Sequence, residues 1–123
     1  MPRDEYELFL KGLEAKRAKV MPQAIEHMHA RRYPEAEKTI VDVDNSIYGA
    51  VAIGKMYTQY LEALVAKGPK RGDALTLEVF KRALHWKQSA YPEPHTAYEG
   101  DSIVSGQAED RAELVKILGY DPE

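Results

Sequence analysis

The chain has 123 residues, within the usual size of a single domain, and a formal net charge of −3. This charge argues against general nucleic-acid binding, and the absence of cysteine excludes disulfides, thiolate metal sites and cysteine nucleophiles. The N-terminus lacks the uninterrupted apolar stretch of a signal peptide, and no run approaches the roughly 18 apolar residues of a membrane span. We therefore expect a cytoplasmic protein.

The first 32 residues predict a helix with one interruption. Asp4 and Glu7 have the spacing of a helix start. Apolar side chains then recur at helical spacing at Tyr6, Phe9, Leu10 and Leu13. Met21-Pro22 should break or kink this helix, because proline disfavours the α conformation in the residue before it. A second helical piece is expected over 23–32, ending before Tyr33-Pro34.

Residues 35–43 could be helix, strand or coil. Their segment TIVDV alternates weakly between apolar and polar residues, as a short strand does. No partner strand is evident elsewhere, and an isolated strand leaves its backbone hydrogen bonds unsatisfied. We therefore favour a connector or a helix turn.

The longest predicted helix covers about 45–66. Asp44 or Asn45 is a plausible N-cap, and Lys67-Gly68-Pro69 is a clear stop. The turn GPKRG follows, after which Asp73 can cap a helix over 74–90. Residues 92–105 contain two prolines and few apolar side chains, which predicts a long loop, and a short last helix is expected over 107–118.

These elements predict an all-α fold, a single domain over 1–123. It would be a small helical bundle of four to five helices built around a central antiparallel helical hairpin, 45–66 and 73–90. The apolar face of the 45–66 helix is wide enough for more than one neighbour, which suggests self-association. The residues expected to form this packing or oligomer face are Ile47, Ala50, Gly54, Tyr57, Leu61, Phe80, Ala83 and Trp86.

The segment GAVAIGKM within this helix is one residue short of a phosphate-binding P-loop. Gly49, Gly54 and Lys55 match that motif, but Met56 stands where a Ser or Thr hydroxyl must bind Mg²⁺. The flanking residues also have helical periodicity. We therefore interpret the glycines as positions where another helix can approach closely.

A metal site is conceivable at His27 or His29 together with Asp42 and Asp44. Two residues apart on a helix, however, the two imidazoles would point about 200° apart. These four residues are therefore weak candidates, and no metal or other cofactor is expected.

The turn between the two hairpin helices is the best candidate for an anion site. Lys67, Lys70 and Arg71 surround a helix N-terminus, which offers free N–H groups. Asp73 at the N-cap argues against the idea because it would satisfy those groups. Tyr91 and Tyr98, which flank the long loop, could supply stacking rings for a nucleotide base.

Residues 60–88 resemble the helical hairpin of phage-encoded cyclic-nucleotide sponge proteins, which blunt CBASS-type bacterial immunity. The matching residues are Pro69, Arg71 and Asp73 in the turn, followed by Phe80, Ala83 and Trp86. The segment 87–89 departs from that pattern, and about 40 N-terminal residues are outside it. The resemblance implies an oligomer that binds signalling nucleotides without hydrolysing them, with Arg71 contacting phosphate.

The function expected from the residues is a non-catalytic interaction or assembly module, forming a homo-oligomer or binding another protein. A sponge-like binding protein for an anionic, nucleotide-type ligand is the alternative. A metal-dependent enzyme is the second alternative, although no catalytic constellation is recognisable and catalysis is not expected. We expect no membrane partner.

Overall fold

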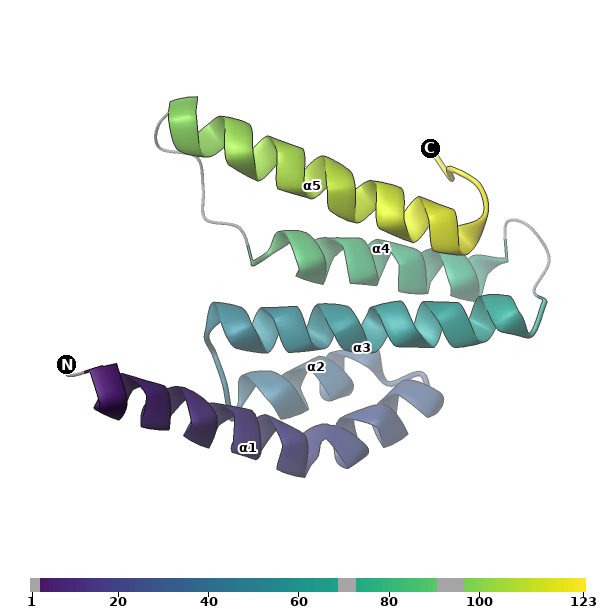
Figure 1. Ribbon diagram of the computed structural model, residues 1–123. Helices are drawn as coiled ribbons and strands as arrows, with labels where there is room; N and C mark the ends of the chain where they lie inside the picture. Colours follow the sequence, from purple (N-terminus) through teal and green to yellow (C-terminus); the bar gives the residue numbers. More distant parts are fainter. Residues whose placement is uncertain (1–2, 69–72, 91–96) are drawn as a thin grey trace. The chain divides into compact units, whose positions relative to one another are not determined.

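The computed structural model describes residues 3–68, 73–90 and 97–123, with side chains over the same ranges except 97–105. These residues form five helices and no strand (Figure 1). The helices are α1 (Arg3–His29), α2 (Tyr33–Val41), α3 (Ile47–Ala66), α4 (Ala74–Gln88) and α5 (Ala97–Leu118). The all-α prediction is confirmed. None of the described helices is both long and apolar enough to cross a membrane.

The chain divides into two compact units, Met1–Ala52 and Ile53–Glu123, and the boundary falls inside α3. The first unit contains α1, α2 and the start of α3. The second contains the rest of α3 with α4 and α5.

In the first unit, Met21-Pro22 is predicted to break or kink the first helix, and α1 continues through Pro22 as one helix, so the break is wrong. Proline removes one hydrogen-bond donor inside a helix and favours bending there, and Figure 1 shows α1 bending along its length. The helix ends at His29, three residues before the predicted end at 32, and Arg31 takes a positive φ of 61°. Ala24 and Met28 are its buried residues.

Helix α2 resolves the ambiguity over residues 35–43. It begins at Tyr33 with a proline in its first turn, where the missing N–H costs nothing. Its buried residues, Tyr33, Ala36 and Ile40, are three and four positions apart and therefore share one face, which packs against α1. Only residues 42 and 43 of the ambiguous segment fall outside this helix.

In the second unit, α3 and α4 form the predicted antiparallel hairpin (Figure 1). Gly68, the second residue after α3, takes a φ of 73°, as a glycine that ends a helix does. The Asp73 side chain accepts a hydrogen bond of 3.0 Å from the backbone N–H of Thr76, which confirms it as the α4 N-cap. Helix α4 ends at Gln88, two residues earlier than predicted.

Gly54 permits the close approach of α4 to α3. A Cβ added at Gly54 would lie 3.0 Å from Cγ of Lys87 and 3.2 Å from its backbone nitrogen. Contacts this short are tighter than a side chain tolerates without displacement of its neighbour. The interpretation of this glycine as a helix-approach position, rather than part of a phosphate-binding loop, is therefore confirmed.

Helix α5 packs against α4 and begins at Ala97, ten residues before the predicted start at 107. The prediction of a loop over 92–105 is therefore wrong from residue 97 onward. Both prolines that suggested the loop precede Ala97, and the residues from 97 to 106 include two glycines, Gly100 and Gly106, but no proline. A glycine costs a helix only about 1 kcal/mol, which neighbouring turns can offset.

The second unit has a continuous apolar core. Its buried apolar residues are Ile53, Met56, Tyr57, Leu61, Val79, Phe80, Ala83, Leu114 and Leu118. Polar contacts join α4 and α5 at the edge of this core: Lys87 Nζ lies 3.3 Å from the Glu113 carboxylate and 3.9 Å from that of Asp110. The Arg111 guanidinium lies 5.9 Å from the centre of the Phe80 ring.

Candidate interaction surface

The exposed apolar side chains are concentrated in the first unit. Among the side chains that the structure describes, seven large apolar ones are exposed: Tyr6, Leu8, Phe9, Ile25, Ile47, Tyr48 and Val51. All seven precede residue 53. Scattered exposed apolar residues are normal on a protein surface, but a contiguous group marks an interaction site.

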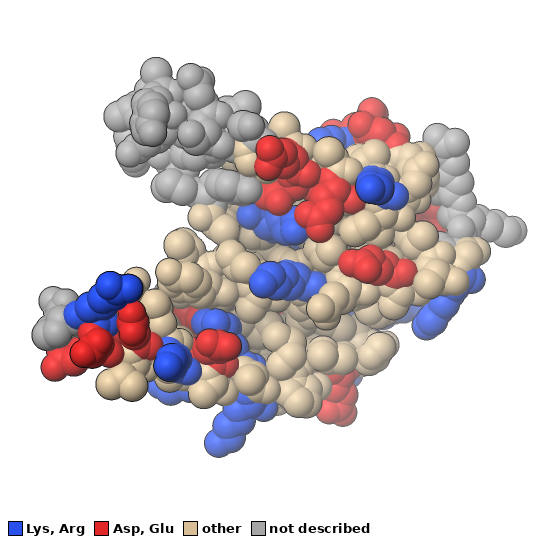
Figure 2. Space-filling model, viewed as in Figure 1, with Lys and Arg blue, Asp and Glu red and all other residues tan. Residues whose placement is uncertain are grey.

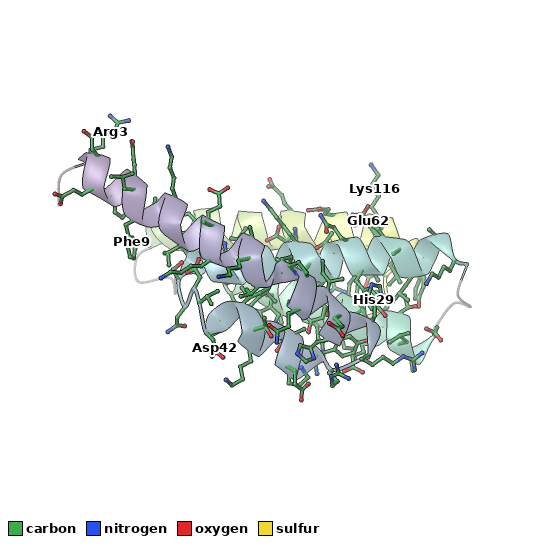
Figure 3. The ribbon with its side chains drawn as sticks, turned by 90° about the horizontal axis from the view of Figure 1, so that it is seen from below. Arg3, Phe9, His29, Asp42, Glu62 and Lys116 are labelled. Carbon is green, nitrogen blue, oxygen red and sulfur yellow. The ribbon has the colours of Figure 1, made fainter. Side chains whose placement is uncertain are left out.

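One of these exposed groups lies on the N-terminal half of α1, at Tyr6 and Phe9. Tyr6, Phe9, Leu10 and Leu13, here called the α1 stripe, share one face of the helix because they are three or four positions apart. Tyr6 is 47% exposed and Phe9 is 55% exposed, whereas Leu10 and Leu13 are half-buried. Figure 3 shows Phe9 and Arg3 pointing to opposite sides of α1.

No described residue of α1 before Ala24 is buried. A helix gains most of its stability by packing its apolar face rather than from its own propensity. The α1 stripe is therefore an amphipathic face of the kind that normally packs against a partner.

Helix α1 carries charged side chains of both signs, and Figure 2 shows blue and red side chains together in its region. Asp4, Glu5 and Glu7 occupy the first turns of α1, and Nε of Arg3 donates a 3.1 Å hydrogen bond to Glu7. Lys11, Lys16 and Lys19 follow toward the middle of the helix. Apart from Arg3 and Glu14, the charged residues of the helix thus change from acidic at its start to basic in its middle.

An ion pair between Arg17 and Asp44 connects α1 to the segment between α2 and α3. The Asp44 side chain is almost completely buried, and the Arg17 side chain is 17% exposed. Asp44 also accepts hydrogen bonds from the hydroxyl and the backbone N–H of Ser46. Burial alone would raise the pKa of Asp44, but these hydrogen bonds and the Arg17 charge together lower it from its ordinary value.

This arrangement corrects the predicted start of α3. Ser46, rather than Asp44 or Asn45, caps the helix, because its hydroxyl accepts a 3.2 Å hydrogen bond from the backbone N–H of Tyr48. Asp44, two residues before Ser46, orients Ser46 by accepting hydrogen bonds from its backbone N–H and its hydroxyl. Gly49 is required here, since a Cβ at that position would overlap the carbonyl oxygen of Asp44.

The four weak metal candidates do not converge. Nδ1 of His27 accepts a 3.0 Å hydrogen bond from Arg32, and Asp42 pairs with Lys38 at 2.8 Å. Asp44 is occupied by Arg17 and Ser46. Figure 3 shows His29 and Asp42 well separated. Within the described ranges, no group of three histidine, aspartate or glutamate side chains could hold a metal ion.

The predicted packing or oligomer face is divided by the structure. Gly54, Tyr57, Leu61, Phe80 and Ala83 are buried within the chain. Ala50 and Trp86 are half-buried, and Ile47 remains exposed. The buried five are therefore used for internal packing, which leaves Ile47 as the most accessible member of the predicted set.

The predicted anion site lies mostly outside the described residues. Lys70, Arg71 and Tyr91 are outside them, as is the side chain of Tyr98. Lys67 is exposed at the end of α3. Because Asp73 accepts from Thr76 at the start of α4, at least one N–H group that an anion would need is already satisfied. Nucleotide binding at this turn stays a prediction.

Sequence reasoning identified the stripe as a helix face but missed the role of Arg17. The sequence gives only a weak signal for this role. Arg17 lies four residues after Leu13 and therefore on the same face of α1 as the stripe. A charged side chain that is buried on such a face needs a partner of opposite charge. That partner, Asp44, is 27 residues away in sequence.

Comparisons with protein-family models, curated proteins and solved structures found no match for this chain.

Proposed function

We propose that this protein is a non-catalytic helical interaction module that assembles with itself through the α1 stripe. The observation that carries the proposal is the exposure of Tyr6 and Phe9 on a helix face whose apolar spacing is that of a packed helix. Exposed aromatic side chains are typical of protein interfaces, since they bury a large area at a small entropic cost.

The position of the stripe supports a role in assembly rather than in folding. The first unit forms its internal contacts further along α1, where Ala24 and Met28 are buried and where Arg17 pairs with Asp44. The stripe precedes both features. Tyr6 and Phe9 therefore contribute little to the internal core that the structure shows, and they gain most when a second molecule covers them.

The stripe is short, so the interface that it forms should be smaller than that of an obligate dimer. We expect a reversible assembly that dissociates on dilution. The average molecular mass in solution should therefore rise with protein concentration.

Two substitutions on neighbouring residues test the proposal. Phe9→Glu places a charge in the stripe, and Leu8→Glu places the same charge on the opposite face of α1 at a side chain that is 68% exposed. Light scattering coupled to size-exclusion chromatography should show loss of the oligomer for Phe9→Glu and retention for Leu8→Glu. Equal loss, or no oligomer in the unsubstituted protein at any concentration, would contradict the proposal.

A further inference from the structure

The charge distribution along α1 indicates how two copies would pair. We propose that the α1 stripes of two molecules pack antiparallel, related by a two-fold axis that passes near Phe9 and Leu10. This inference rests on the self-association proposed above and specifies its geometry. Closed two-fold dimers, in which both molecules use the same surface, are the commonest form of homo-oligomer.

The stripe is compatible with this two-fold arrangement. Tyr6 and Leu13 lie at its two ends, and Phe9 and Leu10 lie at its centre. An antiparallel pair places Tyr6 opposite Leu13 of the second copy, and Phe9 opposite Leu10. Each contact then joins an aromatic ring to an aliphatic side chain, so that large side chains alternate with smaller ones across the interface.

The charges select this orientation over a parallel one. Antiparallel packing brings Glu5 of one copy alongside Lys16 of the other. Parallel packing would place Glu5 beside Glu5 and Lys16 beside Lys16. Juxtaposed like charges disfavour a complex, while complementary charges fix its register.

The helix macrodipole does not explain the whole pattern. It favours acidic residues in the first turn, as at Asp4 and Glu5, and basic residues in the last turn, as at His27 and His29. Lys11, Lys16 and Lys19 are at least ten residues from the C-terminal end, where the dipole effect has faded. Of these three, Lys16 lies at the edge of the stripe, where Glu5 of a second copy accounts for its position.

Two specific ion pairs follow from the helix geometry. Glu5 and Lys16 are eleven residues apart, close to three full turns, and so lie on the same edge of the stripe. Arg3 and Glu14 have the same spacing and lie on the opposite edge. A two-fold axis perpendicular to α1 brings like edges together. Glu5 therefore meets Lys16 of the second copy, and Arg3 meets Glu14.

A charge-swap cycle tests this geometry. Glu5→Lys and Lys16→Glu each convert two attractive contacts per dimer into repulsive ones. Each should raise the dimer dissociation constant about tenfold in low salt. The double variant exchanges the charges and should return the constant to within about threefold of its original value. Glu26→Lys, an exposed change of the same size elsewhere on α1, is the control.

Disulfide trapping provides a second readout, which is clean because the chain contains no cysteine. Glu5→Cys and Lys16→Cys variants are mixed, oxidised and analysed by intact mass. A mixed disulfide between positions 5 and 16, together with rescue in the double charge variant, is the expected result. Disulfides joining 5 to 5 and 16 to 16, with no rescue, would establish parallel packing and overturn the inference while leaving self-association intact.

Two remaining outcomes separate this inference from the proposed function. A dimer that forms in the unsubstituted protein but shows neither cross-link nor charge dependence would use another surface, which overturns the antiparallel geometry alone. An unsubstituted protein that stays monomeric at every concentration would overturn both.

Discussion

The chain has two phenylalanines, one in each compact unit, and their surroundings differ completely. Phe80 in α4 is 1% exposed and belongs to the core of the second unit, with the Arg111 guanidinium over its ring. Phe9 in α1 is 55% exposed and has no comparable enclosure. The same side chain thus stabilises the fold in one unit and remains available to a partner in the other.

The contrast extends to the polar contacts. In the second unit, Lys87 bridges α4 to the carboxylates of α5 beside an apolar core. In the first, the most buried ionic contact joins Arg17 to Asp44 and lies further along α1 than the stripe. The first unit therefore has its buried ionic contact at Arg17, in the middle of α1, while Phe9 near the start of α1 remains exposed. The following predictions test this contrast, in order of decreasing effect on stability.

Phe80→Ala should have the largest effect. Removing a fully buried phenylalanine leaves a cavity and typically costs about 3–5 kcal/mol of unfolding free energy. The measurement is chemical denaturation monitored by circular dichroism at low protein concentration. A loss below about 1 kcal/mol would show that the second unit is less well packed than the structure indicates.

Glycine substitutions separate a required glycine from a dispensable one. Gly49→Ala should cost about 1–3 kcal/mol, because its Cβ would overlap the Asp44 carbonyl oxygen. Gly12→Ala is the matched control: nothing lies within 4 Å of the added Cβ, and alanine favours the helix by up to about 1 kcal/mol. Thermal melts of the two variants should move in opposite directions, and a shared direction would contradict this account.

The Arg17–Asp44 contact should contribute stability that depends on pH. Asp44→Asn removes a buried charged acceptor and should cost about 1–3 kcal/mol at neutral pH. The pKa of Asp44 is lowered in the folded state, so its contribution is present above the ordinary value of 3.8 and is lost as the pH falls toward the folded-state value.

Denaturation of both proteins at neutral pH and near pH 3 measures this difference. The gap in unfolding free energy between the unsubstituted protein and Asp44→Asn should narrow at the lower pH. A gap that is constant or wider in acid would show that Asp44 does not stabilise the fold through its ionised form.

Phe9→Ala should have the smallest effect on folding. Because the ring is more than half exposed, its removal should change the unfolding free energy of the monomer by less than about 0.5 kcal/mol. Denaturation below the dissociation constant of the assembly isolates this quantity. A cost similar to that of Phe80→Ala would mean that Phe9 belongs to the core.

Much of the fold could be predicted from local patterns. The end of α3 at Gly68, the cap at Asp73 and the end of α5 at Gly119 depend on residues close in sequence, whose effect on backbone conformation is intrinsic. The errors arose where a local signal was overruled. Pro22 lies inside a continuous helix, so the break that was one of its two predicted effects is absent, and the prolines that suggested a loop over 92–105 do not prevent a helix from residue 97 onward.

The candidate site was only partly predictable for a related reason. Helical spacing identifies Tyr6, Phe9, Leu10 and Leu13 as one face, but spacing does not say whether that face is covered. Coverage depends on contacts distant in sequence, such as Arg17 with Asp44. The face that had seemed suited to assembly, on α3 and α4, is instead largely used for internal packing at Tyr57, Leu61 and Phe80.

Sedimentation equilibrium across a wide range of protein concentration is the decisive test of self-association through the α1 stripe. The average mass should rise from 13.9 kDa toward twice that value in the unsubstituted protein and should remain at 13.9 kDa for Phe9→Glu. A mass of 13.9 kDa at every concentration of the unsubstituted protein, or an equal rise in the Phe9→Glu variant, would contradict it.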